Sequence, residues 1–302
     1  MATCFAHLSD PHLTTLDGTP LRDLFSKRLL SYLSWRRKRR FEHRREVLDT
    51  LIRDLGQQHC QHVLISGDLT HTGLPREFLE ARRWLERLGP AEQIAVIPGN
   101  HDSLVSTPWE QSYAHWEPYL ASDAGEALPG SSWPSVRVRD NLVFIGLSSA
   151  LPTAPLMATG EVDRGQLEAL VDLLRAHQGK FRVVYLHHSP VAGAEKWRKR
   201  LRNAAAVRAC ISAEGAELVL HGHGHRQRWS ELEGPQGSIP VLAVPSASAR
   251  GLYGADVAAY NLYTVERLRE GWQCRAESRQ LMTDSDRFIA TETREFLLPV
   301  SA

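Results

Sequence analysis

The amino-acid sequence predicts an α/β fold in which two mixed β-sheets pack as a four-layer sandwich flanked by helices. Two observations support this prediction. Through the first two thirds of the chain, short apolar runs typical of buried strands alternate with amphipathic helical patterns. In the last third, short apolar runs alternate with turns, which indicates antiparallel strands that complete the second sheet.

The expected elements follow from the spacing of apolar residues along the chain. Apolar runs predict strands at 5–8, 63–66, 94–97, 136–139, 142–147, 183–186, 218–221, 239–244, 260–265 and 272–274. Helical spacing predicts helices at 46–57, 76–88, 164–177 and 204–211, with a short one near 109–119. The turn Asp140-Asn141 predicts a hairpin between two of the strands. We expect a loop at the mouth of the site within 103–133, and residues 285–302 show no clear period.

Composition limits the class of protein. The chain has 302 residues, 42% hydrophobic and 24% charged, which are ordinary values for a globular protein with a large core. We expect one domain over residues 1–302, because the candidate ligands between Asp10 and His225 must share one core. A formal net charge of +1 does not indicate a nucleic-acid partner. The four cysteines stand singly, which favours reduced thiols over a disulfide framework.

The N-terminal residues lead directly into the first expected strand, which leaves no room for a cleavable signal. No uninterrupted apolar run approaches the roughly 20 residues needed to span a bilayer. We therefore expect a cytoplasmic protein. Peripheral attachment to the inner face of the membrane stays open as an alternative.

Polar motifs follow five of the expected strands. They are Asp10-Pro11-His12, Gly67-Asp68, Gly99-Asn100-His101-Asp102, His187-His188 and Gly222-His223-Gly224-His225. In α/β proteins, functional side chains collect at the carboxyl ends of the strands, so we expect one composite site. Oxygen and nitrogen ligands from Asp, Asn and His suit manganese, iron, zinc or magnesium. Two such ions close together can polarise a phosphoryl group.

Taken in this order, the five motifs resemble the calcineurin-like metallophosphoesterase superfamily over roughly residues 3–281. The resemblance implies that Asp68 bridges two divalent ions, manganese or iron first and zinc or magnesium as alternatives. It implies one metal on Asp10, His12 and His225, and the other on Asn100, His187 and His223. The implied reaction is in-line attack by a metal-bound hydroxide on a phosphorus atom held by both ions.

The resemblance also suggests roles for residues beside the ligands. His101 is the candidate to protonate the leaving oxygen or to steady a phosphoryl oxygen, and Asp102 would fix its tautomer through a hydrogen bond. His188 matches no ligand position, but it is the neighbouring histidine best placed to contact substrate. We expect His7, His71 and His221 to be buried and hydrogen-bonded.

Basic charge is concentrated in an amphipathic insertion at about residues 21–45. Residues 27–45 contain nine basic side chains and a single acid, Glu42, together with apolar residues such as Leu33 and Trp35. One interpretation is a helix whose charged face is solvated while its Leu and Trp side chains pack on the core. The other is a cap that docks on anionic lipid or binds an anionic substrate. A second basic cluster covers 196–202. The candidate substrate-binding residues in the two clusters are Arg36, Arg37, Lys199 and Arg200.

The leading functional hypothesis is a phosphohydrolase that cleaves a phosphodiester or pyrophosphate bond. The stretch 27–35 resembles an insertion in UDP-2,3-diacylglucosamine pyrophosphohydrolases, which favours a lipid-linked nucleotide as substrate. A cyclic nucleotide phosphodiesterase is the alternative, because it needs the metal motifs without such an insertion. An inactive metal-binding scaffold is disfavoured, since every ligand position is filled. The natural substrate, the native metals and the oligomeric state are left open by the sequence.

Overall fold

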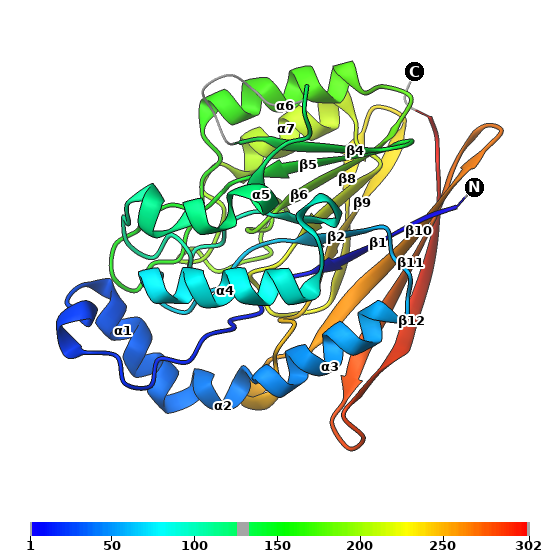
Figure 1. Ribbon diagram of the computed structural model, residues 1–302. Helices are drawn as coiled ribbons and strands as arrows, with labels where there is room; N and C mark the ends of the chain where they lie inside the picture. The colour runs from blue at the N-terminus through cyan, green and yellow to red at the C-terminus, as the bar shows by residue number, and fades with distance from the viewer. Residues whose placement is uncertain (1, 126–132, 301–302) are drawn as a thin grey trace.

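A computed structural model describes residues 2–125 and 133–300 of the chain (Figure 1). Within these residues, two six-stranded mixed sheets carry helices on their outer faces, which confirms the predicted fold class. The first sheet has the order β12-β11-β10-β1-β2-β3 and the second has the order β4-β5-β6-β7-β9-β8. Residues 126–132, part of the loop expected within 103–133, lie outside the described residues.

The strands of each sheet come from both halves of the chain. The first sheet contains β1 (Thr3–Leu8), β2 (His62–Ile65), β3 (Ile94–Val96), β10 (Ala259–Leu268), β11 (Gly271–Met282) and β12 (Arg287–Leu298). The second contains β4 (Ser135–Arg139), β5 (Leu142–Leu147), β6 (Phe181–Leu186), β7 (Leu218–His221), β8 (Arg228–Gly234) and β9 (Gly237–Ala243).

The strands that lead to the five motifs are parallel neighbours within their sheets. In the first sheet β2 lies between β1 and β3, and in the second β6 pairs with β7. Parallel strands end at the same edge, so the motifs emerge together. Between the sheets, Phe5 on β1 and Phe144 on β5 meet edge to face, with ring centroids 5.0 Å apart. This contact lies in a core cluster built from both sheets, which holds the two halves of the site in register.

Amphipathic helices cover the outer faces of the sandwich (Figure 1). They are α3 (Arg45–Gly56) and α4 (Pro75–Leu88) over the first sheet, and α6 (Arg164–Ala176) and α7 (Ala204–Glu214) over the second. Leu51 of α3 and Trp84 of α4 are buried in one core cluster with Ile65 of β2. These four helices confirm the predicted ones, because apolar residues at helical spacing mark the face that each buries.

The predicted hairpin is present, whereas the short helix predicted near 109–119 has a different form. The hairpin of β4 and β5 is confirmed, with Arg139 opposite Leu142 and Asp140 in the left-handed region at φ 52°. The short helix expected near 109–119 is instead a succession of single turns ending in α5 (Glu117–Leu120). Pro108 precedes this stretch and Pro118 interrupts it, so the turns do not join into one continuous helix.

The prediction for the C-terminal strands was wrong in one respect. β9 joins the second sheet as expected, together with β8, which was not predicted. β10, β11 and β12 instead extend the first sheet, because β10 pairs antiparallel with the free edge of β1. The region without a clear period contains the long edge strand β12. Most of its side chains are charged or exposed, and a register shift opposite Ser278 and Arg279 interrupts the alternation that would have revealed it.

The insertion forms α1 (Lys27–Ser34), a π-helical turn (Trp35–Arg39) and α2 (Arg40–Glu42). Trp35 is buried with Leu16 and Leu74 in a small cluster of its own. Leu21 and Phe25 are 69% and 80% exposed, so part of the apolar face points to solvent. None of the helices in the described residues combines the length and the apolar character that crossing a bilayer requires.

Candidate metal centre

The seven residues predicted as metal ligands converge at the edge where the parallel strands end. Asp10 and His12 follow β1, Asp68 follows β2, Asn100 follows β3, His187 follows β6, and His223 and His225 follow β7. Potential ligand atoms form three groups within 4.8 Å: Asp10 with His12 and His225, Asp10 with Asp68 and His187, and His187 with His188 and His223. Both sheets therefore contribute to a single centre.

The first group surrounds Asp10. Its Oδ1 lies 3.1 Å from Nε2 of His225, and its Oδ2 accepts a 2.9 Å hydrogen bond from the backbone N–H of His223. Nδ1 of His12 donates to the carbonyl of Thr70 at 2.9 Å, which leaves Nε2 with the lone pair. That Nε2 is buried, has no hydrogen-bond partner among the described residues, and lies 3.9 Å from Oδ2 of Asp68. A buried acceptor facing carboxylates in this way fits a cation.

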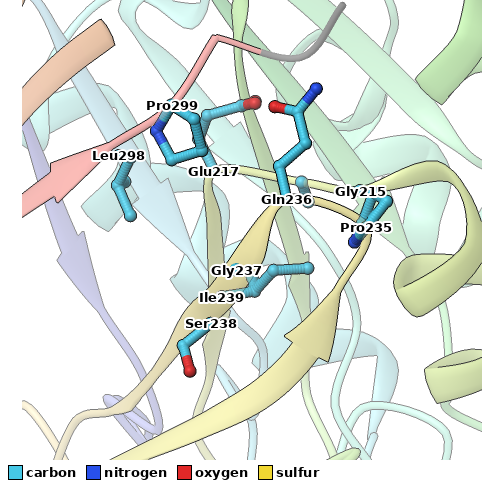
Figure 2. A pocket seen from close by; sticks show the side chains of 10 residues that line it. Gly215, Glu217, Pro235, Gln236, Gly237, Ser238, Ile239, Leu298 and Pro299 are labelled. Carbon is cyan, nitrogen blue, oxygen red and sulfur yellow. The ribbon is translucent and has the colours of Figure 1, made fainter.

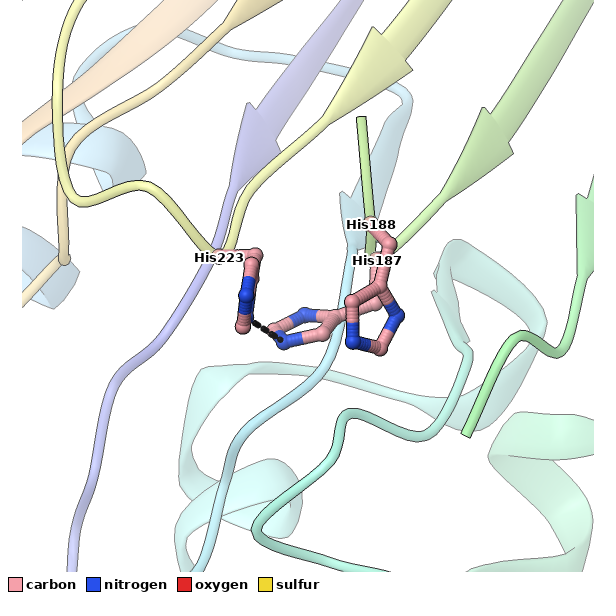
Figure 3. A group of neighbouring side chains, drawn as sticks. All are labelled: His187, His188 and His223. Atoms are coloured by element: carbon pink, nitrogen blue, oxygen red, sulfur yellow. Dashed lines mark hydrogen bonds between the residues drawn. The ribbon is translucent and has the colours of Figure 1, made fainter. Parts of the chain in front are cut away.

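The second group surrounds His187 (Figure 3). Nδ1 of His187 donates to the carbonyl of Ser66 at 2.7 Å, so Nε2 faces the site. Nε2 lies 3.2 Å from Oδ1 of Asn100, 3.2 Å from Nδ1 of His223 and 3.4 Å from Oδ2 of Asp68. A shared cation would bring these ligand atoms together around one charge.

The electrostatics of the centre favour positive charge. Burial alone lowers the pKa of His187, but the nearby Asp68 carboxylate outweighs it and raises the pKa to about 9. For Asp10, burial opposes ionisation, yet the adjacent His225 holds the pKa of the carboxyl well below its usual range. A metal ion bound here would replace the proton on His187, because metal binding displaces protons from its ligands.

The backbone at the centre is strained. Five of the seven predicted ligands have left-handed backbones: Asp10, His12, Asp68, His223 and His225, at φ between 41° and 66°. Residues other than glycine rarely adopt this conformation, and such strain clusters at functional sites. The adjacent Gly222 has no room for a side chain, because a Cβ there would collide with Oγ of Ser9 and Oδ2 of Asp10. The glycines in the motifs thus let the ligand loops approach one another closely.

Comparison with known proteins agrees with this geometry. The family model of calcineurin-like phosphoesterases matches residues 5–227, most of the chain. The chain belongs to the calcineurin-like phosphoesterase family. A calcineurin-like phosphoesterase of this kind is a metal-dependent phosphoester hydrolase, and the two overlapping Asp/His groups fit a dinuclear divalent metal site. No curated protein matches the chain.

Three solved structures are similar to the chain, and the first of them supports the fold. A purple acid phosphatase from yellow lupin is similar with a TM-score of 0.56 at 11% identity, covering 97% of this chain and 53% of the lupin protein. The chain thus spans about half the length of that enzyme. A phosphatase from Mycoplasma pneumoniae has a TM-score of 0.45 at 13% identity, covering 99% and 95% of the two chains. Vps29 from Entamoeba histolytica has a TM-score of 0.44 at 12% identity, covering 97% and 99%.

Asp102 of this calcineurin-like phosphoesterase does not orient His101, which corrects the prediction. Its buried carboxylate instead accepts backbone hydrogen bonds from Gly99, Asp68 and Thr70 at 2.8–2.9 Å. It therefore ties together the loops after β2 and β3. Burial and the neighbouring Asp68 carboxylate raise the pKa of Asp102 to about 7.

His101 is instead oriented by His71 and Arg39, for neither of which the sequence predicted this role. Nδ1 of His101 donates to the backbone carbonyl of His71 at 2.6 Å. Nη1 of Arg39, from the π-helical turn, lies 2.7 Å from Nε2 of His101 and 3.2 Å from Nδ1. Burial and the Arg39 charge lower the pKa of His101 to about 3, so its ring is neutral near pH 7. A usable signal existed: Arg39 is four residues from the apolar Trp35, the spacing that places helical side chains on one face.

His188 has no free nitrogen for substrate, which contradicts the expected contact. Its ring is buried, Oγ of Ser149 donates to Nδ1 at 2.8 Å, and Nε2 donates to the carbonyl of Ala158 at 3.2 Å. His188 also packs against His223, with ring centroids 4.4 Å apart. It therefore packs beside the predicted ligands His187 and His223 (Figure 3).

A cavity of about 280 Å³ opens beside Asn100 and His101. Its basic lining residues are Lys27, Arg39, Lys196, Arg198 and Lys199, and its apolar ones include Leu30, Leu104, Leu156 and Met157. Of the four basic residues predicted to bind substrate, Lys199 lines this cavity. Arg36 and Arg37 are exposed and outside its lining, and Arg200 lines a separate hollow near Trp197.

A small hollow at the opposite end of the second sheet differs sharply from the metal centre (Figure 2). It lies where β7 and β9 begin, between Gly215, Pro235 and Leu298. Its carboxylate, Glu217, is buried in an ion pair with Arg182 at 3.0 Å. This pairing occupies the one carboxylate in the described lining of the hollow.

Proposed function

We propose that the chain hydrolyses a phosphodiester or pyrophosphate bond in an anionic, amphiphilic substrate such as a lipid-linked nucleotide. The observation that carries this proposal is the cavity beside Asn100 and His101, which combines five basic side chains with an apolar wall. A polyanionic headgroup fits the basic side chains, and an acyl chain fits the apolar wall. The insertion contributes to both, through Lys27, Leu30 and Arg39.

The seven predicted ligands divide between two metal ions in this proposal. Asp10, His12 and His225 would hold one divalent ion, Asn100, His187 and His223 the other, and Asp68 would bridge them. Manganese or iron suits this mixed oxygen and nitrogen set, as zinc or magnesium also does. When bound, the two ions lower the pKa of a coordinated water and offset negative charge on phosphoryl oxygens.

The chain's own residues orient the substrate and move the proton. The His71 carbonyl occupies Nδ1 of His101, so Nε2 is the atom through which a proton would reach the leaving oxygen. Nη1 of Arg39 lies against that nitrogen, at 2.7 Å. An anionic substrate that draws Arg39 toward itself would release Nε2 and favour its protonation. Lys27 connects the insertion to the 153–157 loop by donating to Oγ1 of Thr153 and the carbonyl of Met157, which shapes the cavity wall.

We further propose that the exposed part of the insertion contacts an anionic membrane surface. Phe25, Leu29 and Leu33 are exposed, and they lie in the same insertion as the exposed cations Arg36, Arg37, Lys38 and Arg40. Apolar and basic side chains in this combination are typical of segments that lie on lipid headgroups. Such a contact would bring a lipid-linked substrate to the cavity.

A turnover panel tests the proposal. The protein is assayed with added Mn²⁺ on UDP-2,3-diacylglucosamine, bis-p-nitrophenyl phosphate and cyclic AMP. We expect the highest kcat/KM for the lipid-linked nucleotide. Preference for cyclic AMP would favour a cyclic nucleotide phosphodiesterase instead, and no turnover with both metals bound would indicate an inactive scaffold.

A further inference from the structure

Arg39 stands out because its charge is not paired with an acid. Arg39 is partly buried, and within the described residues no carboxylate lies within 4.0 Å of its side chain; Asp68 and Asp10 favour its charge only from a greater distance. Its neighbour is the uncharged His101 ring, 2.7 Å from Nη1. Burying a charge without a counterion is costly, so such an arginine is suited to an anionic ligand.

The location of Arg39 identifies where the anion would bind. The backbone N–H of His101 donates to Oδ1 of Asp68 at 2.7 Å. Because the His101 ring also contacts Arg39, His101 links Arg39 to the predicted bridging ligand. It also lines the cavity that opens from Asn100 toward Lys196 and Lys199. The guanidinium thus lies between the metal centre and the basic part of the cavity.

The charge of the cavity favours a ligand with more than one phosphate. Five basic residues line it, and its described lining contains no aspartate or glutamate. Lys27 is held by neutral oxygens of Thr153 and Met157, so its charge also remains uncompensated. A single phosphate bound at the metal centre would leave these charges facing an empty or neutral cavity.

We propose that Arg39 binds the second phosphate of a diphosphate-linked substrate while the first phosphate lies at the metal centre. This proposal rests on the proposed function for the position of the first phosphate. The planar guanidinium donates two parallel hydrogen bonds to phosphate oxygens, a geometry that a lysine ammonium lacks. Arg39 is then a residue that selects diphosphates over single phosphodiesters.

Ligand binding tests this assignment independently of turnover. Calorimetry on the Mn²⁺-loaded protein compares α,β-methylene-ADP, a non-hydrolysable diphosphate, with AMP. Arg39→Gln should weaken binding of the diphosphate about 10- to 100-fold and that of AMP less than about threefold, as expected for one charged hydrogen-bonding group. Arg39→Lys should recover only part of the loss. Arg44→Gln, an exposed arginine of the same insertion, is the matched control and should bind both as the parent does.

The outcomes separate this proposal from the proposed function. Equal weakening for both ligands, or none for the diphosphate, would overturn the role of Arg39 even in an active hydrolase. A selective loss of diphosphate binding would support the role of Arg39 even if no phosphate ester were hydrolysed. That combination would overturn the proposed function and leave the role of Arg39 standing. Unfolding midpoints within a few degrees of the parent exclude a folding defect.

Cys4 and Cys60 carry a second inference from a separate observation. Their Sγ atoms lie 2.7 Å apart, and both thiols are half-buried and free. Gln61 fixes the backbone beside both, because its Oε1 accepts from the Cys4 N–H at 2.6 Å and its own N–H donates to the Cys4 carbonyl at 3.0 Å. The hydrogen bond with Cys60 lowers the pKa of Cys4, which increases its reactive thiolate form.

We infer that Cys4 and Cys60 form a reversible disulfide in the presence of a disulfide oxidant such as oxidised glutathione. The Cys4 thiolate attacks one glutathione sulfur and releases the other as a thiolate. Cys60 then loses its proton and its sulfur attacks the Cys4 sulfur, which releases the second glutathione. Two protein thiols are oxidised, and one glutathione disulfide is reduced to two thiols.

Thiol counting tests this inference on the full chain. Of the four cysteines, two should remain titratable after treatment with oxidised glutathione and denaturation, and peptide mapping should find the Cys4–Cys60 cross-link. The bond closes a loop of more than fifty residues at the start of β1 and β2, so the unfolding midpoint should rise by roughly 5 °C or more. Cys210→Ser should still form the cross-link. Four titratable thiols, or glutathione adducts without a cross-link, would overturn the inference.

Discussion

Nε2 of His187 lies 3.4 Å from Oδ2 of Asp68, and this approach joins the end of β6 in the second sheet to the end of β2 in the first. The metal centre therefore depends on the packing between the sheets as well as on its ligands. Both side chains are buried, so neither can reach solvent to compensate for a missing ion. Changes at Asp68 should consequently affect both proposed ions together.

Asp68→Asn should lower metal content and turnover together. The amide keeps the shape of the side chain but removes the negative charge that both groups share, while one oxygen can still accept from the His101 N–H. Metal content is measured by plasma mass spectrometry and turnover with bis-p-nitrophenyl phosphate. Asp49→Asn, an exposed carboxylate on α3, is the control and should leave both unchanged. Normal metal content with parental turnover in Asp68→Asn would disprove the bridging role.

His101→Ala should keep both metals and reduce the rate about 10²- to 10⁴-fold, the usual worth of one positioned acid–base group. The loss should be smaller for p-nitrophenyl esters than for alkyl esters, because a good leaving group hardly needs a proton. Steady-state rates on matched aryl and alkyl diesters measure this difference. Equal losses on both would mean that His101 positions the phosphate without transferring a proton.

Gly222→Ala should impair metal binding although the substitution adds only one methyl group. A Cβ at Gly222 would press on Ser9 and on Oδ2 of Asp10, and so displace a predicted ligand. Gly56→Ala, at the end of α3 where nothing lies within 4 Å of the added carbon, should bind metal as the parent does. Manganese titration followed by calorimetry compares the two variants, and equal affinities would contradict the close approach at Gly222.

Replacing Arg36, Arg37, Lys38 and Arg40 with Ser should weaken binding to anionic vesicles by about 1 kcal/mol per charge near the surface. Arg39 is left in place because it lines the cavity. Sedimentation with phosphatidylglycerol vesicles measures binding, and turnover of a soluble diester should stay at the parental level. If the variant binds vesicles as the parent does, the exposed cluster is only a solvated face.

The sequence predicted that the five motifs would meet at one site because each motif directly follows an apolar run, whereas the division of ligands between two ions came from the family resemblance. A strand followed by Asp, Asn or His fixes where the side chain will lie once the parallel edge is known, as for Asp68 and His187. The position of Arg39 could not be read in this way. Five consecutive basic residues look alike in the sequence, and their spacing from Trp35 distinguishes Arg39 only once Trp35 is known to be buried.

The division of the C-terminal strands was also beyond the sequence. An antiparallel strand can pair with either sheet edge, and β10 is selected by the free edge of β1 through long-range pairing such as Cys4 with Thr264. The role of Asp102 illustrates a further limit. Its partners are backbone N–H groups, which every residue carries, so no side-chain pattern could have identified them.

The central claim is a dinuclear metal site bridged by Asp68 between the two sheets. Anomalous diffraction at the manganese edge, from crystals grown with Mn²⁺, tests it directly. We predict two peaks roughly 3.5–4 Å apart, with Asp68 contacting both, His12 and His225 on one, and His187 and His223 on the other. A single peak, or two peaks without Asp68 between them, would contradict the account.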